Sequence, residues 1–472
     1  MKCVLGDPLS RYHSLIGFTH SLARANYRSK EVLFQMPEIT GFHARDKLRI
    51  FLSSTGSGRL DGAYIPGRAH YSYRVVSAKF RAALLDLGCE CIDLPRPEIY
   101  FAPVSRKLVR NPCFHMIFKP PNLFRVLKGV PNIACVAWEF DGFPEIRDRK
   151  RVIPSDDMAY MLQIPDEIWV PCEFTAQIFR QSGIKNVHTV PAPIAIPEPQ
   201  PAIRFPRLPL QLDRISWINL RLGFGRYSDL NSWKPSMPSS LSDIILDQYG
   251  GEEPTVFLSI LNPHDLRKNL SALVSGFLEY SARDKNALLL LKLIADNQED
   301  RLDTILHGIL KIRIAGFELI DSNKIWLTTE YLPEDVLSDL YRFASAYLCT
   351  SLAEGQNLPL MEAMSHGVVP ITTQHTAMLD FIDDQNAVVI ETIREAIDRD
   401  DTAVGPTSNL TWHRCSAGDV ADALEKFAAL STGQKAQLGG NAREAIRQGF
   451  SSDAVRILLA DRFDEMRSNF FT

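Results

Sequence analysis

The sequence predicts an α/β protein of two domains, each built on a parallel sheet with helices on both faces. The chain has 472 residues, which exceeds the usual size of a single domain. Short apolar runs alternate with longer segments of helical periodicity along most of its length. A proline-rich stretch near the middle separates two such alternating units.

The first alternating unit begins near residue 48. An additional strand at 3–5 and a helix at 14–25 are expected before it. A glycine-rich loop at 56–67 and an amphipathic helix at 73–87 follow its first strand. The strands expected in this unit are residues 48–53, 89–94, 114–118, 133–138 and 167–170.

Seven prolines between residues 191 and 209 mark a linker, because neither a helix nor a central strand tolerates them. The polar stretch that follows has weak periodicity and is expected to form loops with a hairpin. The boundaries expected are a first Rossmann-like domain at 1–192, a linker with an irregular insertion at 193–253, a second Rossmann-like domain at 254–450, and a C-terminal helix at 451–472 that packs back toward the first domain.

The second unit repeats the alternation more regularly. Strands are expected at residues 255–261, 288–294, 324–328, 346–350, 368–372 and 387–391. Helices are expected at 269–280, 300–312, 333–343, 358–365, 418–429, 435–446 and 452–470. In doubly wound sheets ligands bind at the carboxyl ends of the strands, so we expect a site in a cleft between the two domains.

Composition narrows the class of partner. A formal net charge of -4 argues against nucleic acid, whose phosphates require a basic excess. Basic residues do cluster, at Arg147, Arg149, Lys150 and Arg151 and again at Arg74, Lys79 and Arg81. We interpret these clusters as solvated faces; the alternative is peripheral contact with an anionic membrane surface or a lipid phosphate.

The cysteines and the apolar runs indicate a compartment. The eight cysteines are scattered, without the two-residue gap typical of zinc or redox sites. The most apolar run, residues 287–295, is interrupted by Lys292 and is too short to cross a bilayer. The N-terminus lacks a signal-peptide pattern. A cytoplasmic protein is therefore expected, with membrane-peripheral attachment as the alternative.

The segment 348–367 predicts a strand, a tight loop and a helix. Asn357 is expected to cap the helix, and Pro359 fits its first turn. Unpaired amides at such a helix start favour an anion such as diphosphate. Glu354 and Glu362 can face one cleft, where carboxylates accept hydrogen bonds from paired sugar hydroxyls. The alternative is that these acids only stabilise the helix.

The phrase SLAEGQNLPLMEAMSHGVVPITT at residues 351–373 resembles the E-x7-E signature of retaining GT-B glycosyltransferases, above all those of family 4. The resemblance implies two Rossmann-like domains facing a central cleft. It also implies that Glu362 binds the ribose hydroxyls of a nucleoside diphosphate sugar and that Glu354 binds the donor sugar. Backbone amides around Gly355, Gln356, Asn357 and Leu358 would meet the diphosphate.

The phrase FLSILNPHDLRKNLSALVSGF at residues 257–277 is similar to the strand and phosphate loop of the same family. There, an arginine at the strand end and a lysine some six residues later hold the diphosphate. Lys268 stands at the lysine position, but Asn262 stands where the arginine is usual. Arginine binds phosphate through a planar pair of donors that asparagine lacks, so Arg267 is expected to supply the charge.

Residues of the acceptor side are expected at strand ends of the first domain. By the resemblance, Glu139 in the segment Trp138 to Asp141 is the candidate to contact the acceptor, with a helix cap as the alternative role for Asp141. His70 is a second candidate, and His115 is expected to be a core residue. In the second domain, Thr376 is expected to line the donor pocket together with His375 and Ala377.

No metal and no cofactor are expected, with the sugar nucleotide acting as donor substrate. Asp398 and Asp400 have D-x-D spacing but belong to a charged stretch. The function predicted is transfer of a hexose, with retention, to a glycan or lipid-linked acceptor in polysaccharide or glycoconjugate synthesis. The alternatives are a GT-B epimerase or phosphorylase, and a non-catalytic partner that binds a sugar nucleotide or glycan for another transferase.

Overall fold

The computed structural model describes residues 47–54, 69–99, 113–144, 153–220, 237–294, 324–397 and 410–471. The side chains of residues 69–72 and 471 are not described. The strand and helix expected before residue 47, the loop at 56–67, the helix at 300–312 and Asp398 with Asp400 lie outside this part of the chain.

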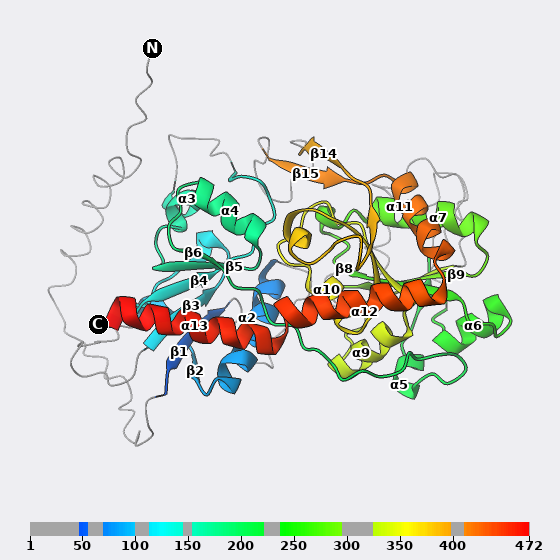
Figure 1. Cartoon of the computed structure of the whole chain (residues 1–472), viewed down its shortest axis with the longest axis horizontal. Helices are drawn as coiled ribbons and strands as arrows, with labels where there is room; N and C mark the ends of the chain where they lie inside the picture. Colours follow the sequence, from blue (N-terminus) through cyan, green and yellow to red (C-terminus); the bar gives the residue numbers. More distant parts are fainter. Residues whose placement is uncertain are drawn as a thin grey trace, which may run out of the picture. The chain divides into compact units, whose positions relative to one another are not determined.

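The first sheet is entirely parallel, in the order β2-β1-β3-β4-β5-β6 (Figure 1). The order reverses between β1 and β3, because β2 lies on one side of β1 and the later strands lie on the other. The strands are β1 (Arg49–Ser54), β2 (Glu90–Asp93), β3 (Cys113–Phe118), β4 (Asn132–Cys135), β5 (Glu167–Val170) and β6 (Val187–Thr189).

The second sheet has the order β13-β12-β11-β8-β9-β10-β7, parallel except for the antiparallel edge strand β7. Its strand order reverses between β8 and β11, the position at which doubly wound sheets bind ligands. The strands are β7 (Ile218–Asn219), β8 (Thr255–Leu261), β9 (Ala287–Leu293), β10 (Ile325–Thr328), β11 (Ala346–Cys349), β12 (Val369–Thr373) and β13 (Val388–Ile390).

Helices cover both faces of each sheet, which explains why the strands are apolar on both sides. The helices are α2 (Ala69–Asp86), α3 (Met158–Met161), α4 (Glu173–Gln181), α5 (Leu210–Asp213), α6 (Leu241–Tyr249), α7 (Leu270–Arg283), α9 (Glu334–Phe343), α10 (Leu358–Ser365), α11 (Ala417–Ala429), α12 (Thr432–Gly449) and α13 (Ser452–Phe471). None of the helices in the described ranges is both long and apolar enough to span a bilayer.

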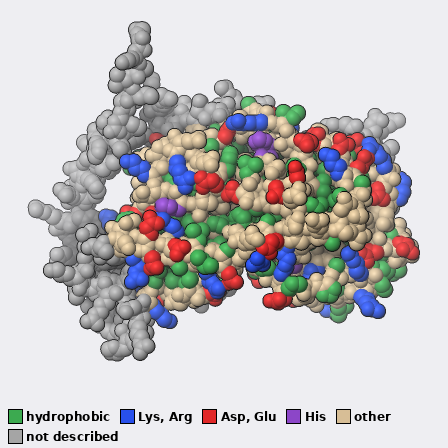
Figure 2. All heavy atoms as spheres, viewed as in Figure 1, with side chains coloured by type: hydrophobic (Ala, Val, Ile, Leu, Met, Phe, Trp, Pro, Cys, Tyr) green, Lys and Arg blue, Asp and Glu red, His purple; other side chains and the backbone are tan. Residues whose placement is uncertain are grey.

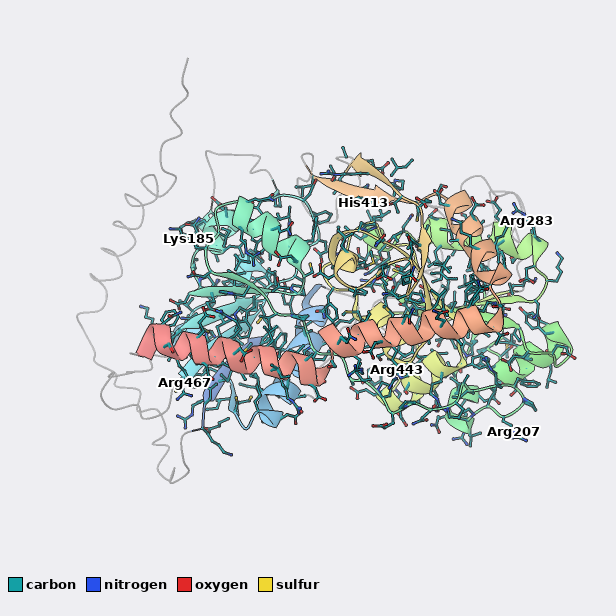
Figure 3. All side chains as sticks on the ribbon, viewed as in Figure 1. Lys185, Arg207, Arg283, His413, Arg443 and Arg467 are labelled. Atoms are coloured by element: carbon teal, nitrogen blue, oxygen red, sulfur yellow. The ribbon has the colours of Figure 1, made fainter. Side chains whose placement is uncertain are left out.

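The last two helices, α12 and α13, are consecutive in the chain and pack against different sheets (Figure 1). Ala442 and Ile446 of α12 pack in the core of the second sheet. Val455 and Phe463 of α13 pack in the core of the first, where the Phe463 ring centroid lies 5.7 Å from that of Trp169. In Figure 3, Arg443 lies on α12; it donates to the carbonyls of Ser365 and Pro197. The helix is thereby tied to the linker.

The stretch expected to be loops with a hairpin is more regular than that. It contributes α5, α6 and the edge strand β7, and an isolated antiparallel bridge joins Trp217 to Ser239. Its buried apolar residues, among them Trp217 and Leu241, join the core of the second sheet. The loop expectation was wrong at α6, where Leu241, Ile244 and Ile245 recur at helical spacing and pack in that core. The domain boundaries themselves stay predictions.

His115 occupies the core of the first sheet, as expected, and is fully buried. Its Nδ1 donates to Asn132 Oδ1 at 2.8 Å, since that oxygen already accepts from the Leu127 amide. Its Nε2 lies 2.7 Å from Ser53 Oγ. Burial lowers the pKa of His115 from 6.5 to about 4, although the hydrogen bond to Asn132 opposes this.

A neutral core histidine makes the fold sensitive to acid. Below pH 6.5 the unfolded chain binds a proton at His115 that the folded chain does not bind. The stability that the neutral histidine contributes is therefore fully present above pH 6.5 and is lost as the pH falls toward 4. The difference between these two pKa values corresponds to about 3 kcal/mol of unfolding free energy. Denaturant titrations at several pH values should show a shallower pH dependence in His115→Gln than in the wild type. The exposed His264→Gln is the control, and equal slopes in all three proteins would contradict this account.

Candidate functional site

A small pocket lies at the carboxyl ends of β8 and β11, where the strand order of the second sheet reverses. Its lining includes Ser259 and Ile260 of β8, Tyr347 and Cys349 of β11, and Lys268, Ser351, Glu354 and Asn357 from the loops that follow these strands. The site predicted from the sequence and the pocket of the structure therefore share one edge of one sheet.

Glu354 lies at the centre of this site and is 4% exposed. Lys268 Nζ lies 2.5 Å from its Oε1, and Ser351 Oγ donates to the same oxygen at 2.6 Å. Burial by itself lowers the pKa of Lys268, but the nearby carboxylates of Glu354 and Asp265 outweigh it and leave the pKa above its ordinary value. Lysine and glutamate are thus held as a charged pair in a setting with little water.

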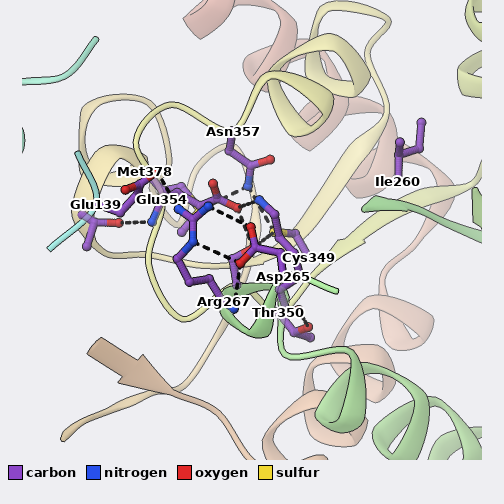
Figure 4. Close-up of polar contacts among 12 residues, drawn as sticks. Glu139, Ile260, Asp265, Arg267, Cys349, Thr350, Glu354, Asn357 and Met378 are labelled. Atoms are coloured by element: carbon purple, nitrogen blue, oxygen red, sulfur yellow. Dashed lines mark hydrogen bonds and ion pairs between the residues drawn. The ribbon is translucent and has the colours of Figure 1, made fainter. Parts of the chain in front are cut away.

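Arg267 adds a second cation beside this pair (Figure 4). Its guanidinium lies 2.7 Å from Asp265 and 2.6 Å from Glu139, which belongs to the first alternating unit. Burial lowers its pKa, yet the carboxylates of Glu139, Asp265 and Glu354 raise it overall, so it stays charged. Asp265 also accepts from the Arg267 amide at 3.1 Å, which fixes the short 3-10 turn that carries both cations.

Asn262 forms the turn and carries no charge toward the pocket. Its Oδ1 accepts from the His264 amide at 3.0 Å, and its carbonyl accepts from the Asp265 amide at 3.2 Å. The positive charge of the loop after β8 is therefore provided by Arg267 and Lys268.

The expected cap of α10 is not made. Asn357 stands just before the helix, but its φ is 66° and its side chain makes no capping bond. Its Nδ2 instead donates to Cys349 Sγ at 3.2 Å. Packing inside the loop replaces the usual capping geometry. The Asn357 side chain therefore makes no hydrogen bond to the backbone amides at the start of α10.

Glu362 is half-buried on α10 and is joined to the first unit. Its Oε1 lies 2.8 Å from Lys79 Nζ of α2, and its Oε2 accepts from the Tyr341 hydroxyl at 3.3 Å. The sequence placed Lys79 only in a solvated basic cluster. Its helical position was the available signal, but nothing in the sequence indicated that α2 would face α10.

The remaining donor-side candidates surround the same loop. Thr376 Oγ1 accepts from the Glu354 amide at 3.0 Å. Gln356 is turned away, with its side-chain amide paired to both backbone groups of Ala192 at 3.0 and 2.8 Å. His375 Nε2 lies 2.9 Å from the Ser351 carbonyl. Leu358 is the first residue of α10.

Gly355 marks the close approach of the two alternating units. A Cβ placed on it would lie 3.1 Å from the Ala137 side chain and 3.6 Å from that of Glu139. A larger residue would push the segment after β4 away from the loop. The glycine thus allows Glu139 to reach Arg267.

Other candidates of the acceptor side are found elsewhere. Asp141 does not cap a helix; it accepts from the amide and hydroxyl of Thr411 at 2.9 and 2.6 Å and pairs with Arg394. These partners belong to the hairpin β14 (Ile393–Ala396) and β15 (Thr411–Arg414), which the sequence did not predict. His70 lies in α2, but its side chain is outside the described part of the chain. Within the described residues, no cluster of three metal-ligating side chains occurs.

Three solved structures are similar to this chain in fold. Sucrose-phosphate synthase from Thermosynechococcus elongatus is 13% identical, with 90% of this chain and 100% of that chain covered and a TM-score of 0.53. HepE from Anabaena, solved with UDP and glucose, is 10% identical, with 89% and 100% covered and a TM-score of 0.51. A glycosyltransferase from Rickettsia africae is 12% identical, with 90% and 100% covered and a TM-score of 0.51.

The fold is GT-B. This confirms the architecture predicted from the sequence, two Rossmann-like domains. In addition, residues 269–399 match the family model described as Glycosyl transferases group 1, and this match supports a glycosyltransferase. No curated protein matches the chain. The chain spans about half the length, 54%, of two similar structures of TarM, one of them named as the S. aureus protein.

Proposed function

We propose that the protein transfers a hexose from a nucleoside diphosphate sugar to a hydroxyl of a carbohydrate or lipid-linked acceptor, with retention at the anomeric carbon. The observation that carries the proposal is the ion pair of buried Glu354 with half-buried Lys268, with Arg267 beside it, at the switch point of the second sheet. A carboxylate next to two cations suits a ligand that presents both hydroxyls and phosphates. The group 1 match and the UDP and glucose bound by HepE support this choice.

Each side of the pocket has a proposed role. Glu354 accepts from hydroxyls of the donor sugar, and Glu362 accepts from those of the ribose. Lys268, Arg267 and the amides from Gly355 to Leu358 hold the diphosphate, where the start of α10 adds a favourable dipole. These roles follow the resemblance in sequence, and the geometry is compatible with them.

In the proposed reaction the bond from the anomeric carbon to the phosphate oxygen breaks, and a bond from that carbon to the acceptor oxygen forms on the same face. The acceptor proton passes to the departing phosphate oxygen, so no separate base is required. Lys268 and Arg267 balance the charge that develops on the leaving nucleoside diphosphate, and the proposed enzyme needs no metal.

Glu139 is a carboxylate of the first unit that reaches this site. It pairs with Arg267, so we assign it to the acceptor side, where its carboxylate accepts from the attacking or a neighbouring hydroxyl. We place the protein in polysaccharide or glycoconjugate synthesis in the cytoplasm. On the face shown in Figure 2, Lys and Arg side chains are interspersed with Asp and Glu side chains, which favours solvated surface over peripheral membrane contact there.

A second candidate is a non-catalytic partner that binds a sugar nucleotide or glycan for another transferase. Two ion pairs in the site favour this non-catalytic candidate. Arg267 with Glu139 and Lys79 with Glu362 engage groups that a donor would need. Both pairs must part before a donor binds.

Donor binding and turnover separate these candidates. We expect one family of UDP-, GDP- or ADP-sugars to raise the melting temperature, because a ligand at a hundred times its Kd stabilises by about 2.7 kcal/mol. Proton NMR of the product or of the hydrolysed sugar should show the anomeric configuration of the donor. Stabilisation without transfer or hydrolysis, across acceptors, would favour the non-catalytic partner. An absence of any shift would contradict both candidates.

A further inference from the structure

β9 carries a lysine within an otherwise apolar strand. Its sequence is ALLLLKL, and Lys292 is its one charged residue and the one side chain that is not fully buried. Side chains alternate along a strand, so Lys292 shares a face with Leu288 and Leu290, which pack in the core beneath α10. In parallel register Lys292 stands opposite Ile260 of β8 and Thr328 of β10.

Among the described residues no carboxylate lies within ion-pair distance of this lysine. The contact of its Nζ is with the carbonyl of its neighbour Leu293, at 3.4 Å. Burial lowers the pKa of Lys292 to about 8, and no neighbouring charge opposes this effect. A largely buried ammonium that meets no carboxylate in the described part of the chain costs stability, whereas a leucine here would continue the apolar run. The lysine is therefore a candidate for a role in binding.

Its position relative to the pocket suggests which part of a ligand it meets. Ile260 lines the pocket, and the Tyr347 hydroxyl reaches across to the Ile260 backbone, at 3.2 Å from its nitrogen and 3.1 Å from its oxygen. Paired residues on neighbouring strands point to the same face and lie about 5 Å apart, so Lys292 stands one strand from the wall of this pocket, a distance that a lysine side chain can span. The phosphate-binding cations lie on the loop after β8 and face β11. Lys292 thus lies on the opposite side of β8, away from them.

We propose that Lys292 selects the nucleobase of the donor, favouring a base with a ring carbonyl, uracil or guanine, over adenine. This inference rests on the proposed donor site. An ammonium has three hydrogen-bond donors and no acceptor. Uracil and guanine present a carbonyl oxygen on the base edge, where adenine presents an amino group, itself a donor. In a site with little water, a matched carbonyl satisfies the ammonium and an amino group leaves it unpaired.

The test is the affinity for UDP, GDP and ADP of the wild type, Lys292→Met and Lys285→Met, measured by calorimetry. Methionine keeps the length and apolar stem of lysine without its charge. Lys285 is exposed just before the opposite end of the same strand, so its replacement controls for net charge. We expect the wild type and Lys285→Met to bind UDP or GDP at least about tenfold more tightly than ADP, as one satisfied hydrogen bond to a charged group predicts. The comparison of UDP with GDP identifies the base.

For Lys292→Met we expect the preferred nucleotide to lose about tenfold in affinity while ADP changes less than about twofold. The melting temperature should stay the same or rise, because a largely buried charge that meets no carboxylate among the described residues has been removed. Equal loss for all three nucleotides, an unchanged preference, or a wild type that prefers ADP would overturn the role of Lys292 and leave the donor site standing. Failure of the wild type to bind any of the three would count against the proposed function as well.

Discussion

Glu354→Gln is expected to lower transfer by about 100-fold to 1,000-fold with the fold intact. Glutamine has the same shape, and its Oε1 can still accept from Ser351 Oγ and Lys268 Nζ, but without the negative charge it attracts the Lys268 ammonium far less strongly. The ammonium then turns away from the position where leaving-group charge develops. Steady-state kinetics with saturating acceptor would show the loss mainly in kcat.

Two further variants separate charge from structure. Glu354→Asp keeps the carboxylate one methylene shorter and should recover part of the activity. Glu334→Gln removes an exposed carboxylate at the start of α9 and should change nothing. Circular dichroism and melting curves check the fold, because an unpaired Lys268 destabilises it to some degree. Unchanged transfer in both Glu354→Gln and Glu362→Gln would refute the donor-site assignment.

Local sequence pattern was sufficient for the framework of the second domain. The expected bounds of β8 and α10 coincide with those observed, and β5 in the first domain does too. These elements have compact apolar runs with clear turns on either side, so neighbouring residues alone determine them. The sequence also placed Lys268 and Glu354 at one edge of this sheet, since parallel strands bring their carboxyl ends together, but it did not predict their ion pair.

Contacts between distant segments could not be predicted in this way. Lys79 meets Glu362 and Glu139 meets Arg267 only because α2 and the end of β4 pack against the second domain. Nothing in the local sequence records that approach. The αL conformation of Asn357 is similar, because its side chain is drawn to Cys349 rather than to the helix start. Sequence reasoning therefore grouped the candidate residues of the second domain and did not predict their contacts with the first.

The loop after β8 differs from the family pattern at Asn262, where an arginine is usual. Moving the positive charge from position 267 to position 262 therefore tests which residue supplies it. If Arg267 provides the missing charge, Arg267→Met should lower kcat/KM by about 100-fold, in the range found when a charged donor to a transition state is removed. Arg283→Met is the control, because Arg283 lies exposed at the end of α7, as Figure 3 shows, and pairs there with Glu279 and Glu425.

The rescue is the informative measurement. Adding Asn262→Arg to Arg267→Met places a guanidinium at the strand end. We expect the double variant to have a kcat/KM at least about tenfold higher than that of Arg267→Met, because a planar pair of donors again reaches the diphosphate. Alone, Asn262→Arg should change kcat/KM by less than about threefold, since it disturbs a turn that the His264 amide helps to form but supplies a charge already present. A loss in Arg267→Met that Asn262→Arg does not restore would mean that Arg267 acts through Glu139 and the contact between domains. Activity within about threefold of wild type in Arg267→Met would leave Lys268 as the sole cation that the leaving group requires.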